Sequence, residues 1–494
     1  MPDEGGRNVL FVVLDTVRKD HLTPYGYDRP TTPELESFAD EACVYTQAIT
    51  QAPWTLPAHA SMFTGRYPSE HTATQESPYL PATAGTLAES LSAAGYATAC
   101  YSSNAWITPY TRLTMGFDDA DNFFRALPGA VPSALASVWQ WLTDGRTRPI
   151  ADRIVEAGND VHERLAESGN DSKTPEIVDE ACSFVDAHAD GRWFAFVNLM
   201  DAHLPYYPSE PHRSRLASDA DPDAVCQNSK EYNAGAREIT DEEFDDIRRL
   251  YDAEIAGMDE QLGRLFDHLK AAGQWEETVI VVCADHGELH GEFDLYGHEF
   301  AVYDPLVNVP LLVKHSGLDA GRTDEQVELL DLYDTVLETA EATEIAATVG
   351  GRPFDSNRSL LSDERSIDDG EYAFIEYHRP IVELKQLESK AASAGVELDE
   401  QSRFYSRMFA VRHPEGKYIR NERIADEYYR IDDGLMETTQ LLPGEPIAAE
   451  LEAALDRFRS RANGPANSNE GPEQLLPEMD NATKRRLEAL GYLD

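Results

Sequence analysis

The sequence predicts an α/β fold: a mostly parallel central sheet flanked by helices, followed by a smaller C-terminal α+β domain. Short apolar runs alternate with longer amphipathic segments over residues 1–350, as in parallel strands joined by helices. Beyond residue 350 the strand-like runs lie closer together, as in antiparallel hairpins. The chain of 494 residues is also longer than one domain usually is.

The elements follow in order along the chain. The expected strands of the central sheet are Val9–Leu14, Val44–Ile49, Tyr96–Tyr101, Trp193–Leu199, Thr278–Ala284 and Val309–Val313. The helices expected between or after them are Pro33–Glu41, Thr83–Ala94, Thr174–His188, Asp241–Ala272 and Gln326–Ala342. The strands expected in the smaller domain are Glu371–His378, Phe404–Arg412, Lys417–Asn421 and Glu427–Ile431, with a hairpin turn at Pro414–Gly416.

These elements predict three parts of the chain. Residues 1–350 form the large α/β domain, and residues 351–462 form the small antiparallel-sheet domain. Residues 463–494 form a linker and a terminal helix, because residues 463–477 are rich in Asn, Gly, Pro, Ser and Glu.

The charge of the chain excludes some partners. A formal net charge of −48, spread along the sequence, repels nucleic acid and anionic membranes. Such an acidic composition is typical of halophilic proteins, in which molar salt screens the self-repulsion. The five scattered cysteines favour a reducing compartment. The first apolar run, Val9–Leu14, is too short for a signal peptide or a membrane span, so we expect a cytoplasmic protein.

Two of the predicted strands are followed by carboxylates. Asp15 follows the first strand, and Asp285 and His286 follow the strand that begins at Thr278. Ligands of parallel sheets bind beyond the carboxyl ends of the strands, where two carboxylates and an imidazole can gather a divalent cation. Taken singly, each aspartate could simply begin a polar loop.

The segment WTLPAHASMFTG predicts a short helix with Thr55 at its amino terminus. Pro57 suits the first turn and Gly65 the end of the helix. Thr55 is either a helix cap or, beside a metal, a nucleophile. His59 lies one turn on and could touch Thr55 or a bound anion, or could be a buried polar neighbour.

Several segments together resemble the sulfatase family of the alkaline phosphatase superfamily, in order and in rough spacing. They are the stretch from Asn8 to Leu22, TPEL at 32–35, APWTLPAHASMFTGRYPSEH, FVNLMDAHLPYYP, VVCADHGE with the following GHEFAVYDPLVNVPLLV, and the C-terminal KYIRN, DEYYRI and LEALGYLD. The resemblance implies an alkaline phosphatase-like fold for the large domain, which would be catalytic.

The resemblance also implies roles for single residues. The metal ligands would be Asp15, Thr55, Asp285 and His286. Thr55 would also be the nucleophile, and His59 would help to hold the substrate oxygens. His203 and His298 would contact the substrate anion or protonate the leaving group, although either histidine could instead be structural. One divalent ion is expected, Ca²⁺ or Mn²⁺ in the first place and Mg²⁺ or Zn²⁺ as alternatives.

The departures from the family pattern bear on the reaction. Family members that hydrolyse sulfate esters usually carry a Cys or Ser that becomes formylglycine, which Thr55 cannot form. Thr16 replaces a second early aspartate, and Ser102–Trp106 replaces a Gly-Lys-Trp-His stretch. Branches with threonine at the nucleophile position act on phosphodiesters.

We therefore expect a metal-dependent hydrolase or transferase of phosphate esters or diesters with a threonine nucleophile. The first alternative is a sulfatase that works without formylglycine. The second is a non-catalytic protein that binds sulfated or phosphorylated glycans. The expected substrate is a small-molecule or glycan ester, without nucleic acid or a membrane span, and the sequence leaves the oligomeric state open.

Overall fold

The computed structural model describes residues 7–109, 111–123, 172–362, 372–379, 381–432 and 436–462. The linker and terminal helix predicted over residues 463–494 lie outside these ranges.

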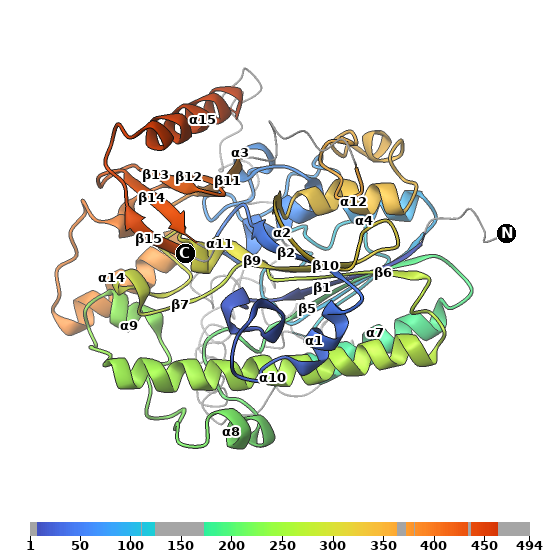
Figure 1. Ribbon diagram of the computed structural model, residues 1–494, viewed down its shortest axis with the longest axis horizontal. Helices are drawn as coiled ribbons and strands as arrows, with labels where there is room; N and C mark the ends of the chain where they lie inside the picture. Colours follow the sequence, from blue (N-terminus) through green and yellow to red (C-terminus); the bar gives the residue numbers. More distant parts are fainter. Residues whose placement is uncertain are drawn as a thin grey trace, which may run out of the picture.

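An eight-stranded, mostly parallel sheet forms the centre of the large domain (Figure 1). Its strands, in spatial order, are β10 (Gly321–Glu328), β2 (Cys43–Ile49), β9 (Asn308–Lys314), β6 (Thr278–Cys283), β1 (Asn8–Leu14), β5 (Trp193–Leu199), β3 (Ala97–Ser102) and β4 (Asp119–Asn122). Among the described strands of this sheet, only β9 runs antiparallel to its neighbours, β2 and β6. Every residue of β1 and β6 is buried, as expected for inner strands covered on both faces.

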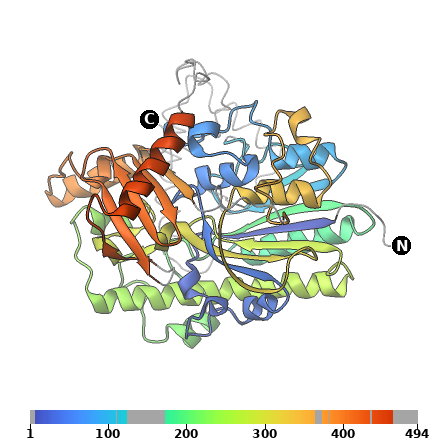
Figure 2. The ribbon, with the colours of Figure 1, turned by 45° about the horizontal axis from the view of Figure 1, so that its top comes forward.

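Helices cover both faces of this sheet. The 31-residue α10 runs along one face with α7 and α1, while α2, α4 and α12 lie on the other (Figures 1 and 2). The helices of the large domain are α1 (Pro33–Ala39), α2 (Thr55–Thr64), α3 (Pro68–His71), α4 (Leu87–Ala93), α7 (Thr174–Ala187), α8 (Glu210–Leu216), α9 (Ser229–Asn233), α10 (Asp241–Ala271), α11 (Asp304–Val307) and α12 (Asp331–Thr339). A two-stranded ribbon pairs β7 (Leu289–His290) with β8 (Tyr296–Gly297).

A five-stranded antiparallel sheet forms the smaller C-terminal domain, beside the large one (Figure 2). Its strands are β11 (Ala373–Tyr377), β12 (Met408–His413), β13 (Gly416–Asn421), β14 (Glu427–Asp432) and β15 (Met436–Gln440). Helix α15 (Pro446–Ala462) packs on β12 and β13, and α14 (Ile381–Ala394) packs on α9 of the large domain. The hairpin predicted at Pro414–Gly416 is confirmed, because His413 pairs with Gly416.

Some boundaries differ from the prediction. The helix predicted over Gln326–Ala342 was wrong at its start, because residues 326–328 belong to β10 and pair with β2. This edge strand has a polar sequence, which an open edge tolerates. The strand predicted from Phe404 also starts later, after a short 3₁₀ turn at Arg403–Tyr405. Helices α14 and α15 and strands β4 and β15 were not predicted.

One helix start has a clear local cause. The helix predicted over Thr83–Ala94 begins at Leu87 as α4. The Thr86 hydroxyl accepts a hydrogen bond from the Glu89 N–H, and the Glu89 carboxylate accepts one from the Thr86 N–H. This capping box satisfies two backbone donors and fixes the start of the helix.

A buried ionic cluster joins the two domains. Asp304, in α11 of the large domain, lies 2.8 Å from Lys417 Nζ and 3.2 Å from the guanidinium of Arg412, both on strands of the small domain. All three side chains are fully buried. Burial opposes ionisation of Asp304, but Lys417 and Arg412 outweigh it and hold the pKa of this carboxyl below its usual range.

Within the described residues, no helix combines the length and the apolar character that a membrane crossing requires.

The Asp304→Ala variant should lose about 3–5 kcal/mol of unfolding free energy, because it leaves two buried cations without their shared partner. Urea denaturation followed by tryptophan fluorescence measures this loss. The control is Glu210→Ala, which breaks a surface pair with Arg213 and should not shift the urea midpoint. Equal midpoints for the two variants would contradict a stabilising role for the cluster.

Candidate active site

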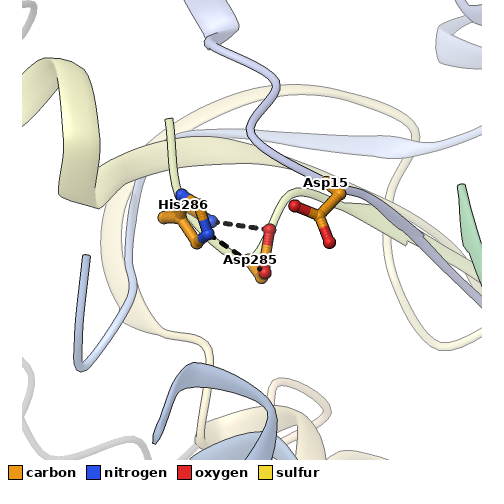
Figure 3. Close-up of side chains that lie close together, drawn as sticks. All are labelled: Asp15, Asp285 and His286. Carbon is orange, nitrogen blue, oxygen red and sulfur yellow. Dashed lines mark hydrogen bonds and ion pairs between the residues drawn. The ribbon is translucent and has the colours of Figure 1, made fainter. Parts of the chain in front are cut away.

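Three potential metal ligands meet at the carboxyl ends of two neighbouring strands (Figure 3). Asp15 follows β1, and Asp285 and His286 follow β6. These strands are parallel neighbours in which Val13 pairs with Cys283, so their ends coincide. One ligand atom from each of the three side chains lies within 4.8 Å of the other two, and all three side chains are fully buried. The structure thus brings together three of the four residues predicted to hold a metal.

Each of these side chains is held by one atom and has another atom that makes no hydrogen bond within the described residues, although His286 Nε2 and Asp285 Oδ2 lie 3.4 Å apart (Figure 3). Asp15 Oδ2 accepts hydrogen bonds from Asn104 and Asn198, and Asp285 Oδ1 accepts them from the backbone N–H groups of Thr16 and His286. Within the described part of the chain, Asp15 Oδ1, Asp285 Oδ2 and His286 Nε2 have no hydrogen-bond partner. Burying such atoms unpaired is costly, and a divalent cation would satisfy all three.

The charges of the cluster fit a cation. Burial, followed by the nearby Asp15 carboxylate, raises the pKa of Asp285 well above its usual range. Burial also lowers the pKa of His286, which favours the neutral imidazole that binds metals. The His286 Nδ1 atom lies 3.0 Å from the carbonyl oxygen of Gly287, which leaves Nε2 for a ligand. Two carboxylates and a neutral imidazole are a fitting donor set for a divalent ion.

Thr16 supports this site through its backbone. Its φ angle of 60° lies in the left-handed region, which is uncommon for threonine and typical of strain at functional sites. The Thr16 N–H donates to Asp285, while its hydroxyl donates to the carbonyl oxygen of Ala202, 2.6 Å away. The Thr16 side chain is therefore occupied in a backbone contact.

Thr55 is the first residue of α2 and lines a cavity of about 140 Å³. Trp54 is the N-cap, and no side chain caps this helix end. The Thr55 hydroxyl oxygen instead lies 3.3 Å from Asn104 Nδ2, which also donates to Asp15 Oδ2 at 2.7 Å. Of the two interpretations of Thr55, the structure therefore does not support the cap.

His59 lies behind the cavity and does not line it. Its Nδ1 lies 2.9 Å from the Thr55 carbonyl oxygen and 3.5 Å from Asp285 Oδ2, and its ring packs against Phe63 and Phe196. Burial lowers the pKa of His59 to about 4, so the ring is neutral at pH 7. The expected contact of His59 with substrate oxygens stays a prediction, and the ring would bring no positive charge to it.

His203 and His298 both line the cavity, with ring centroids 5.2 Å apart. The His298 ring also lies 4.5 Å from that of His286. Burial disfavours a charged His298, but Glu288, 3.1 Å from its Nδ1, and Glu299 together raise its pKa to about 9. The two carboxylates therefore favour the protonated form of His298.

Other residues of the cavity were missed by the sequence analysis. Asn104 follows β3, so its place after a strand was a usable signal. Lys230 in α9, Glu299 after His298, and Glu383 in α14 also line the cavity. Nothing in the local sequence pointed to Lys230 or Glu383, because only the tertiary structure brings α9 and α14 together.

The chain is similar to a known protein family and to several characterised proteins. A family model described as Sulfatase matches residues 7–342. The multifunctional alkaline phosphatase superfamily protein PehA of Trinickia caryophylli is 25% identical over 381 residues, which are 67% of this chain and 73% of that protein. A choline-sulfatase of Rhizobium meliloti is 22% identical and covers 92% of this chain and 86% of its own length.

Solved structures share the fold. A phosphonate monoester hydrolase from Silicibacter pomeroyi superimposes with a TM-score of 0.64 at 20% identity. The match covers 92% of this chain and 94% of that one.

The Asn104→Ala variant should bind a divalent metal about 10–100-fold more weakly, because Asp15 loses the donor that orients it. Titration calorimetry of the metal-stripped protein with Mn²⁺ measures the affinity, and Ca²⁺, Mg²⁺ and Zn²⁺ test the alternatives. The control, Asn357→Ala, changes an exposed residue and should match the wild type. Unchanged Mn²⁺ affinity in the Asn104 variant would count against this orientation.

Proposed function

The chain belongs to the sulfatase family, whose members are ester hydrolases, and we propose that it is a metal-dependent hydrolase or transferase of phosphate esters and diesters with Thr55 as the nucleophile. The observation that carries this proposal is the position of the Thr55 hydroxyl. It lines the cavity, bonds to the same Asn104 amide as Asp15, and makes no capping contact.

Asp15, Asp285 and His286, together with the Thr55 hydroxyl, would hold the metal. When bound, a divalent metal supplies Lewis-acid chemistry that draws electron density from the ester oxygen and lowers the pKa of a coordinated hydroxyl. The unpartnered atoms of the three buried side chains support this role.

In the proposed mechanism the reaction takes place in two displacements at phosphorus. Thr55, after releasing its hydroxyl proton to solvent, forms a bond to phosphorus as the bond to the leaving oxygen breaks. A cavity histidine gives the leaving oxygen a proton, and His298 suits this step because Glu288 keeps it protonated. The amino-terminal end of α2 adds partial positive charge beside the phosphoryl oxygens.

The second displacement restores the enzyme. Water, or an acceptor alcohol in a transferase, attacks the phosphorus in line and gives its proton to the histidine that acted as the acid. The bond between Thr55 and phosphorus breaks in this step, and the Thr55 oxygen takes up a proton from solvent. A formylglycine hydrate can instead expel its ester by elimination, which a threonine ester cannot do. This difference supports phosphoryl rather than sulfuryl transfer.

A sulfate ester is the second candidate. It is favoured by the family match and by the relative named choline-sulfatase. The same residues would serve, with Thr55 forming a sulfate ester that a second attack resolves.

The Thr55→Ala variant should lose at least about 10³-fold in metal-dependent kcat/KM, because it has no oxygen to form the covalent ester. Turnover of an aryl phosphodiester and of an aryl sulfate, each with Mn²⁺ and with EDTA, measures the loss and ranks the two ester classes. The Thr55→Ser control keeps the hydroxyl and should keep most of the activity.

Near-full activity of Thr55→Ala on either ester would refute the nucleophile assignment. Faster turnover of the sulfate by the wild type would favour the second candidate. Tight metal binding without turnover of any ester would favour a binding protein over an enzyme.

A further inference from the structure

The cavity beside Thr55 has a second end, built jointly by the two domains. Lys230 comes from α9 of the large domain, and Glu299 follows His298 in the same domain. Glu383 and Gln386 come from α14 of the small domain. All four residues line the same cavity as Thr55. A substrate whose ester group lies at Thr55 would have these four residues among its neighbours in the cavity.

Charge at this end is arranged around two cationic groups, Lys230 and the His298 ring, whose Nε2 lies 3.9 Å from Glu299 Oε1. The Lys230 ammonium forms a close ion pair with Glu299 Oε1 and lies 2.8 Å from Glu383 Oε2. Burial disfavours the charged lysine, but the two carboxylates outweigh it and raise its pKa above its usual range. In the same way, burial opposes ionisation of Glu299, but Lys230 and His298 lower its pKa to about 2. The trio of Lys230, Glu299 and Glu383 has one formal negative charge. The pair of a protonated His298 with Glu288 beside it adds no net charge.

The charges of the trio determine which ligand groups it can bind. The charge of Lys230 is already more than compensated, so it does not offer a free cation to an anionic group. Glu299 and Glu383 are more than nine-tenths buried. Within the described residues, Glu299 Oε2 accepts no hydrogen bond, and Glu383 Oε2 has the ion pair with Lys230 alone. Buried carboxylate oxygens with acceptor sites to spare favour a ligand that brings hydrogen-bond donors and disfavour one that brings negative charge.

Aromatic side chains form another part of the cavity lining. Trp54 and Trp106 line it and meet edge to face with ring centroids 5.3 Å apart, and Tyr377 also lines it. Aromatic faces pack against the C–H surface of a small alcohol and attract an ammonium group.

We propose that this end of the cavity is a leaving-group subsite that selects alcohols rich in hydrogen-bond donors, hydroxyl or ammonium, and rejects alcohols that carry a second negative charge. The subsite rests on the proposed function and specifies its substrate class. The small domain takes part in recognition through Glu383, which belongs to no strand of the catalytic sheet.

Matched sugar esters test this selection. Glucose 6-phosphate has a neutral leaving group, glucosamine 6-phosphate a cationic one, and glucose 1,6-bisphosphate an anionic one, and the corresponding sulfates serve if the enzyme prefers sulfate. We expect kcat/KM to be at least about 100-fold lower for the anionic member than for the other two. The ratio of glucosamine to glucose ester separates ammonium from hydroxyl recognition. Equal or faster turnover of the anionic ester would overturn the proposal.

Two substitutions on α14 distinguish the effect of a charge inside the subsite from the effect of the total charge of the protein. Glu383→Gln removes one charge inside the subsite, and Glu388→Gln removes one from the exposed side of the same helix, where Glu388 contacts Tyr405. Glu383→Gln should lower the ratio of kcat/KM for the neutral ester to kcat/KM for the anionic ester about tenfold, while Glu388→Gln should leave this ratio unchanged. Identical effects of the two variants would refute the subsite.

A binding measurement on an inactive variant tests the subsite independently of catalysis. Tryptophan fluorescence of the Mn²⁺-loaded Thr55→Ala protein, in which Trp54 and Trp106 report on the cavity, is titrated with glucosamine, glucose and glucuronate. Glucosamine or glucose should bind more tightly than glucuronate, and Glu383→Gln should reduce the difference. Preferential binding of glucuronate, or no binding of any sugar, would overturn the subsite. Absence of turnover with the expected binding order would instead reject only the proposed function.

Discussion

The repulsion between two buried carboxylates is the constraint on which this site depends. Asp15 and Asp285 end neighbouring parallel strands and are both fully removed from water, so neither charge is relieved by solvent. Asn104, Asn198 and backbone N–H groups fix one oxygen of each carboxylate, which leaves the other two oxygens facing each other's charge. A proton on Asp285, whose pKa is raised by burial and by Asp15, or a bound cation would relieve this repulsion.

The same network extends from the carboxylates to the candidate nucleophile. One amide group, that of Asn104, contacts both Asp15 and Thr55. Asn104 is itself fixed on both sides, since its N–H donates to Ser102 and its side-chain oxygen accepts from the Trp106 N–H. The position of the Thr55 hydroxyl is thus coupled to that of Asp15, one of the candidate metal ligands, as expected of a preorganised site.

The small domain is part of the active region. It is joined to the large domain by the buried ion pairs of Asp304 with Lys417 and Arg412. Its helix α14 contributes Glu383 to the lining of the cavity. The site therefore combines strand ends, which carry the candidate metal ligands, and the start of α2, which carries Thr55, with residues of a second domain that line the same cavity. This division of labour lets specificity change without disturbing the reaction.

Sequence alone determined the inner strands and the residues that follow them. Val9–Leu14 and Thr278–Ala284 are short apolar runs that predict buried strands, as β1 and β6 confirm, and parallel strands place Asp15 and Asp285 at one edge. Polar residues at an edge strand or in a short helix carry no such signal, so β10, α9 and α14 were misjudged or missed. Only the tertiary structure decided that Thr55 makes no cap, that Asn104 bridges it to Asp15, and that Lys230 meets Glu383. These contacts join residues far apart in sequence, and no local pattern encodes the packing that brings them together.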